Sequence, residues 1–127
     1  MITNFEKITA ELDEDEMKMI PIFVEGFKKY TIANPITAPK IVANFNSRTH
    51  AGIKKKLTEP RLRKIVNYIR SCGMLPLIAT SEGYYVSHDP QVVRDQIRSL
   101  MERAKSIARC ADGLKKFTKV SQGEFEL

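Results

Sequence analysis

Residues 57–87 read LTEPRLRKIVNYIRSCGMLPLIATSEGYYVS, and the order of signals within them decides the fold. Thr58 is a favourable N-cap and Pro60 is tolerated in a first helical turn, so a helix is expected to begin here. Apolar residues then recur at i, i+3, i+4 and i+7, which predicts one narrow buried stripe. The stripe consists of Leu62, Ile65, Val66 and Ile69. Gly73 can end this helix in a left-handed conformation.

A β-hairpin is predicted directly after this helix. Residues 75–80 have the composition of a strand, residues 81–83 (Ser-Glu-Gly) that of a turn, and residues 84–87 that of a returning strand. Strand alternation directs one of Tyr84 and Tyr85 toward the core and the other outward. Closure of a small core is the simpler role for the buried tyrosine.

The N-terminal part predicts a first helix. Asp13 and Glu16 have the spacing of a capping box, and apolar residues follow at helical spacing to about Thr31. Pro21 lies inside this segment and removes one backbone hydrogen bond, so we expect it to kink the helix or to divide it. The Asn-Pro dipeptide at residues 34–35 marks a break before the next element.

A second, short helix is predicted between Thr37 and about Asn46. Thr37 can act as its N-cap, and its apolar stripe consists of Ile41, Val42 and Phe45. The following residues 47–56, SRTHAGIKKK, contain a glycine and four basic residues. They predict a basic loop between the second and third helices.

A long helix is predicted from Pro90, with Asp89 as its N-cap. Apolar residues follow at spacings of 4-3-4-3-4-3, a heptad seam. The seam consists of Val93, Ile97, Leu100, Ala104, Ile107, Ala111 and Leu114. One interpretation is that its first part packs on the chain's own domain. The other is that the helix pairs with a second copy, and the dimerisation candidates are then Ile97, Leu100, Ala104, Ile107, Ala111 and Leu114.

These elements together predict an α+β fold that is mostly α. The expected architecture is a winged helix-turn-helix, with a three-helix core and a two-stranded β-wing, followed by a long C-terminal helix. The expected organisation is an N-terminal arm over residues 1–12, a winged-helix domain over 13–89, the long helix over 90–117 and a tail over 118–127.

The charge of the chain is unevenly distributed. The net charge is +6 over 127 residues, yet residues 1–16 hold six acids and one lysine, whereas residues 48–70 hold eight basic residues and one acid. Such a basic block favours a polyanionic partner. The N-terminus lacks a secretory signal and no apolar run is long enough to span a membrane, so we expect a cytoplasmic protein.

The residue types that carry catalysis or bind metals are scarce and scattered. Cys72 and Cys110 form no CxxC pair, and His50 and His88 are equally isolated. No glycine loop that could cradle a phosphate occurs, and no Cys-His or His-carboxylate pair lies close together in the sequence. We therefore expect no enzyme, no catalytic residue, no metal site and no cofactor.

The helix over residues 58–72 has the two faces that a DNA-reading helix needs, one apolar and one polar, because the major groove of B-DNA admits an α-helix. On a helical wheel Lys64 and Asn67 project farthest from the stripe and are the first candidates for base contacts. Neighbouring basic residues are candidates for phosphates. The predicted DNA-contacting set is Arg48, Lys54, Lys55, Lys56, Thr58, Arg61, Arg63, Lys64, Asn67 and Tyr68. An ordinary amphipathic surface helix is the alternative.

Residues 34–87 resemble a winged helix-turn-helix domain. The segments TEPRLRKIVNYIRSCG and IATSEGYYVS resemble the Ser/Thr…Val-Arg…Leu-Arg…Gly and Gly-Tyr pattern of the third helix and wing in the biotin-repressor type. The whole chain, including SLMERAKSI, is similar to small winged-helix proteins of phages and prophages, which are mostly of unassigned function. The long basic loop before the third helix departs from the pattern. The resemblance implies a double-stranded DNA partner and a role in gene regulation or replication.

Two functions are compatible with these observations. The first is sequence-specific or structural binding of double-stranded DNA, with a homodimer presenting two reading helices to two half-sites. The second is a protein–protein interaction module in a replication or regulatory complex. In the second case the acidic N-terminal segment and the C-terminal helix would be the working surfaces.

Overall fold

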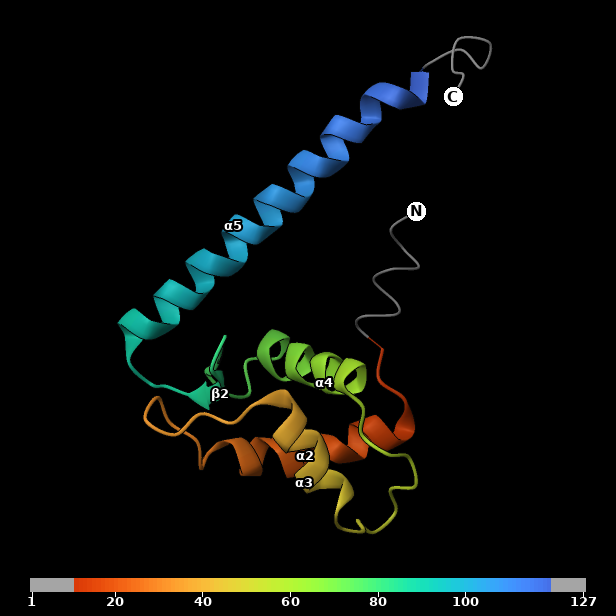
Figure 1. The fold of residues 1–127 in the computed structure, drawn as a ribbon, viewed down its shortest axis with the longest axis vertical. Helices are drawn as coiled ribbons and strands as arrows, with labels where there is room; N and C mark the ends of the chain where they lie inside the picture. The colour runs from red at the N-terminus through yellow and green to blue at the C-terminus, as the bar shows by residue number, and fades with distance from the viewer. Residues whose placement is uncertain (1–10, 120–127) are drawn as a thin grey trace. The chain divides into compact units, whose positions relative to one another are not determined.

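The computed structural model describes residues 11–119 (Figure 1). Its elements are α2 (Glu14–Phe27), α3 (Ala38–Asn46), α4 (Glu59–Ser71), β1 (Leu77–Thr80), β2 (Gly83–Val86), α5 (Pro90–Lys115) and the 3-10 turn η1 (Lys116–Lys119). This content confirms the expected α+β, mostly helical class. The chain divides into two compact units after Asp89. Most of the predicted arm (1–12) and tail (118–127) lies outside the described residues.

Helix α2 begins with the predicted capping box. The Asp13 carboxylate accepts from the Glu16 amide at 2.7 Å, and the Glu16 carboxylate accepts from the Asp13 amide at 2.9 Å. Pro21 does not divide the helix. Since both Pro21 and Met17 are exposed, water can bond the Met17 carbonyl that loses its helical partner.

Helix α2 ends at Phe27, four residues earlier than expected. The chain turns here because the Tyr30 amide donates to the Phe27 carbonyl at 3.0 Å, and the Tyr30 carbonyl accepts from the Val86 amide of β2 at 3.0 Å. Tertiary pairing with the hairpin therefore overrides the helical period that continues in the sequence.

The first unit is built around α4, which packs against α2, α3 and β1, as Figure 1 shows for the helices and hairpin. All four residues of the predicted stripe are buried, with Leu62, Ile65 and Ile69 fully so. Thr58 caps the helix through its hydroxyl, which accepts from the Arg61 amide at 3.3 Å. Gly73 follows the C-cap with a φ of +65°, as predicted. The predicted bounds of α3 are also confirmed, but the Thr37 side chain at its N-cap position makes no capping hydrogen bond.

Strands β1 and β2 form the predicted hairpin, in a register that pairs Leu77 with Val86 and Thr80 with Gly83. An element that sequence reasoning missed joins it: Ile36, between α2 and α3, forms an antiparallel bridge with Tyr84 through bonds of 2.9 and 2.7 Å. The segment before α3 thus covers the outer edge of β2. The resulting order of helix, bridging residue, two helices and hairpin is compatible with a winged-helix-like layout.

The two tyrosines of the hairpin lie on opposite faces, as strand alternation predicts, but the one directed away from the core is also buried. The Tyr84 ring packs beside Phe27, with centroids 5.9 Å apart, on the core side. Tyr85 lies on the opposite face, paired in register with Ile78, and both of these side chains are buried. Both tyrosines therefore have packing roles.

Candidate functional site

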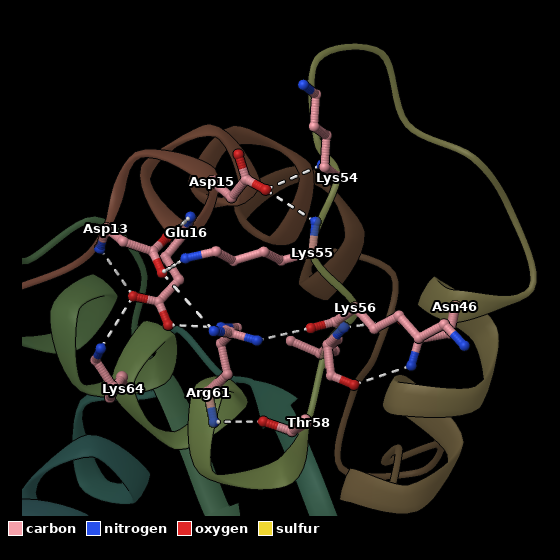
Figure 2. A network of polar contacts seen from close by, with 11 residues as sticks. Asp13, Asp15, Glu16, Asn46, Lys54, Lys55, Lys56, Thr58, Arg61 and Lys64 are labelled. Atoms are coloured by element: carbon pink, nitrogen blue, oxygen red, sulfur yellow. Dashed lines mark hydrogen bonds and ion pairs between the residues drawn. The ribbon is translucent and has the colours of Figure 1, made fainter.

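A buried carboxylate lies beside the N-terminal half of α4. Glu16, the third residue of α2, is only 2% exposed. Its Oε2 accepts from Arg61 Nε at 2.8 Å, and its Oε1 accepts from Lys64 Nζ at 3.0 Å as well as from the Asp13 amide (Figure 2). The Glu16 carboxylate thus pairs with two cations of α4 and also completes the capping box of α2.

The loop before α4 is fastened to the same end of α2. Asp15 accepts from the backbone amides of Lys54 and Lys55 at 2.9 and 2.8 Å, and Asp13 accepts from Lys55 Nζ at 2.9 Å (Figure 2). Arg61 also donates to the Lys56 carbonyl at 2.9 Å. The acidic and basic blocks that the sequence places about 40 residues apart therefore meet in one network.

Asn46, the last residue of α3, fixes the other side of the loop. Its amide nitrogen donates to the Leu57 carbonyl and its amide oxygen accepts from the Leu57 amide, both at 2.9 Å. Figure 2 shows Asn46 beside the segment that enters α4. Leu57 is itself buried. The start of α4 is thereby held from both α2 and α3.

This network changes the exposure and pairing of several residues that are predicted to contact DNA. Lys64 does not project farthest from the core, because it bends to Glu16 and is 31% exposed, and Arg61, 24% exposed, does the same. Lys55 is paired with Asp13. Tyr68 packs against the core, and the Thr58 hydroxyl is used as a cap.

The other predicted contact residues keep exposed side chains. They are Arg48, Lys54, Lys56, Arg63 and Asn67. Within residues 11–119 their side chains make no hydrogen bond or ion pair. Arg63 and Asn67 are one turn apart on α4, with Asn67 on the side away from the buried stripe and Arg63 on its flank, and both side chains are exposed to solvent.

One signal in the sequence could have revealed the role of Glu16. It precedes Met19, Ile20 and Phe23 by three, four and seven residues, so it lies in phase with the buried stripe of α2. A carboxylate on an apolar stripe requires charged or hydrogen-bonding partners. The capping box accounts for only one of its bonds, and the remaining two come from α4.

The His50 side chain packs against the end of α3. Its ring stacks on Phe45, with centroids 4.1 Å apart, and its Nε2 lies 3.1 Å from the Phe45 carbonyl oxygen. Both rings line a hollow of about 320 Å³ between α2 and α3, together with Lys29 and Arg48. Within the part of the chain that the structure describes, no three His, Cys, Asp or Glu residues are grouped so that they could hold a metal ion.

The network lowers the pKa values of the three acids at the start of α2. For Glu16, burial alone would raise the pKa, but the bonds from the Asp13 amide, Lys64 and Arg61 outweigh it and lower the pKa. For Asp13, burial likewise opposes the bonds from the Glu16 amide and Lys55, and the net pKa is lowered. The amides of Lys55 and Lys54 lower the pKa of Asp15. All three acids therefore bind protons less readily in the folded chain.

Acid should accordingly destabilise the first unit. Since these folded-state pKa values lie below the unfolded ones, their contribution is present above the unfolded pKa and is lost as pH falls through the folded pKa. We expect the urea midpoint to fall steeply from about pH 5 downward. Urea titrations followed by circular dichroism at several pH values measure this, and Glu16→Gln should flatten the slope. An unchanged midpoint down to about pH 3 would contradict the network's role.

Comparison with known protein families, with curated proteins and with solved structures finds no match. No helix among residues 11–119 is long and apolar enough to cross a membrane.

Proposed function

We propose that the chain binds double-stranded DNA as a winged helix-turn-helix domain, with the exposed face of α4 in the major groove. The observation that carries the proposal is the pair Arg63 and Asn67. Both side chains are exposed and without partners in the described part of the chain, and both lie outside the buried stripe of α4. Arginine can pair with guanine and asparagine with adenine in the major groove.

The order of elements supports this orientation. Helices α3 and α4 are consecutive, the hairpin follows α4 at once, and the Ile36 bridge fastens the hairpin to the segment before α3. In helix-turn-helix proteins the second helix of the pair enters the groove and the first crosses the backbone. In this arrangement α4 is the helix that enters the major groove.

The loop before α4 supplies the phosphate contacts in this proposal. Arg48, Lys54 and Lys56 have exposed side chains there, and the backbone of Lys54 is held by Asp15. Phosphate contacts position a protein on DNA without reading its sequence. Arg61 and Lys64 act instead as positioning residues, because they fix α4 to α2 through Glu16.

Substitutions should separate base reading from phosphate binding. On a duplex obtained by selection from random sequences, Arg63→Ala and Asn67→Ala should each weaken binding by about 5- to 150-fold and relax the preference at one base pair. Lys56→Ala should weaken all duplexes alike and reduce the salt slope by about 1. Fluorescence anisotropy measures both effects.

The control is Lys28→Ala, which removes an exposed cation that is paired with Glu25 near the C-terminal end of α2. It should leave affinity within about twofold, since an exposed pair contributes little. Loss of binding that is equal for Lys28→Ala and Arg63→Ala would argue against α4 as the reading element.

Charge reversal separates DNA binding from the alternative role in protein interaction. Reversal at Arg61 or Lys64 would place a second acid against the buried Glu16 and perturb the fold itself. Arg63→Glu avoids this, since Arg63 has no partner in the described residues. Loss of DNA binding with an unchanged unfolding curve supports the proposed function, and full retention of binding contradicts it.

A further inference from the structure

Helix α5 runs for 26 residues without a single buried side chain. Its five largest exposed apolar residues are between 39% and 67% accessible, and they are Ile97, Leu100, Met101, Ile107 and Leu114. Most of the stability of a protein helix comes from packing of its apolar face. We therefore expect the apolar seam of α5 to pack against another surface.

The seam alternates large and small side chains in a particular way. In heptad terms Ile97, Ala104 and Ala111 occupy the a positions, and Leu100, Ile107 and Leu114 occupy the d positions. Two of the three a positions are therefore alanine, whereas every d position is large. A matching surface should place large residues against the alanines.

We propose that α5 pairs with α5 of a second copy as an antiparallel, two-fold symmetric coiled coil. The register that fits is the one in which facing residue numbers add up to 211. It sets Ile97 opposite Leu114, Leu100 opposite Ala111 and Ala104 opposite Ile107, and the two-fold axis repeats each layer. Every alanine then meets an isoleucine or a leucine, so the seam is complementary to itself.

A parallel pair fits less well. It would stack Ala104 on Ala104 and Ala111 on Ala111, leaving gaps between layers of larger residues. It would also place Ile107 at a d position, where parallel dimers favour leucine. Ion pairs between the two helices favour neither orientation, because the acidic residues Asp95, Glu102 and Asp112 lie off the seam. In the antiparallel register Arg94 approaches Lys115 only at the exposed ends, where solvent screens their repulsion.

The seam has the size of the smaller specific interfaces. Full burial of a leucine or isoleucine removes roughly 60–120 Å² from water. The large side chains of the seam, flanked by Ala104, Ala108 and Ala111, thus offer on the order of several hundred Å² per chain. A standard specific interface takes about 800 Å² from each partner.

Sedimentation of the full chain should give the mass of two chains. Ile107→Glu puts two charges near the two-fold axis and should weaken association by at least about 100-fold. The matched control is Ser106→Glu, which adds the same charge one residue away and off the seam, and it should leave the dimer intact. A monomer of the unchanged chain at high concentration overturns the proposal, as does a dimer that is unaffected by Ile107→Glu.

Distances between spin labels report whether the two α5 helices run parallel or antiparallel, and the labelling leaves the seam residues unchanged. With Cys72 and Cys110 replaced by serine, labels are attached after Ser106→Cys or Asp95→Cys. In the antiparallel register the two labels at position 106 lie nearly opposite each other, whereas those at position 95 are about 30 Å apart along the axis. Equal short distances at both positions indicate a parallel pair and overturn the register. Neither experiment requires DNA, so failure here is distinguishable from failure of DNA binding.

Discussion

Glu16→Ala should lower the free energy of unfolding of the first unit by about 3 kcal/mol. The substitution removes half of the capping box and leaves Arg61 and Lys64 without the buried carboxylate that they share. Breaking a fully buried pair costs about 3–5 kcal/mol, and the partial exposure of both cations places this case at the lower end. Since whole domains are stable by about 5–15 kcal/mol, the effect is a large fraction of the total.

Urea unfolding followed by circular dichroism measures this loss. The matched control is Glu14→Ala, in the same helical turn, where the side chain is 87% exposed and lies 3.6 Å from Lys18. It should change stability by less than about 0.5 kcal/mol. If the two substitutions had equal effects, the Glu16 network would not hold α4 in place.

Gly83→Ala should destabilise the first unit by about 3 kcal/mol or more. Gly83 has a φ of +128°, where side chains are rarely found, and an added Cβ would lie 2.5 Å from the Ile36 carbonyl oxygen. That oxygen cannot move away easily, because it accepts the 2.7 Å bond from the Tyr84 amide. The clash therefore acts on the bridge that joins the hairpin to the helices.

Thermal and urea unfolding of Gly83→Ala should be compared with Gly26→Ala. A Cβ at Gly26 meets nothing within 4 Å, and the residue lies in α2. This control should stabilise the unit by about 0.5–1 kcal/mol, since alanine favours helix and restricts the unfolded chain. A Gly83→Ala protein as stable as the unchanged chain would contradict the close approach of Ile36 to β2.

Local signals were sufficient to locate the helices and the hairpin, except for the C-terminal end of α2. The Asp13 capping box, the Thr58 cap, the stripe from Leu62 to Ile69 and Gly73 each depend on neighbours within a few residues, and the structure confirms all of them. Such features are encoded in spacing alone, so sequence reasoning can find them.

Contacts between distant residues were not predictable in this way. The Glu16–Lys64 and Ile36–Tyr84 pairs each join residues 48 positions apart. The phase of Glu16 with the α2 stripe indicates its burial, but no periodicity identifies the partner in either pair. A helical wheel places Lys64 on the outer face because it describes α4 alone. The acids at the start of α2 pair with Lys64 and Arg61, and among the basic and amide residues predicted to contact DNA from α4 this leaves Arg63 and Asn67 exposed and unpaired within the described residues.

The most direct test of the account is the salt dependence of DNA binding. Anisotropy of a labelled duplex is titrated with the full chain at about 50 and 200 mM salt. If Arg48, Lys54, Lys56 and Arg63 of one chain contact phosphates or bases, the affinity of that chain should fall by about 100-fold between these conditions. Absence of binding at the lower salt concentration, or binding that salt does not weaken, would contradict the proposed function.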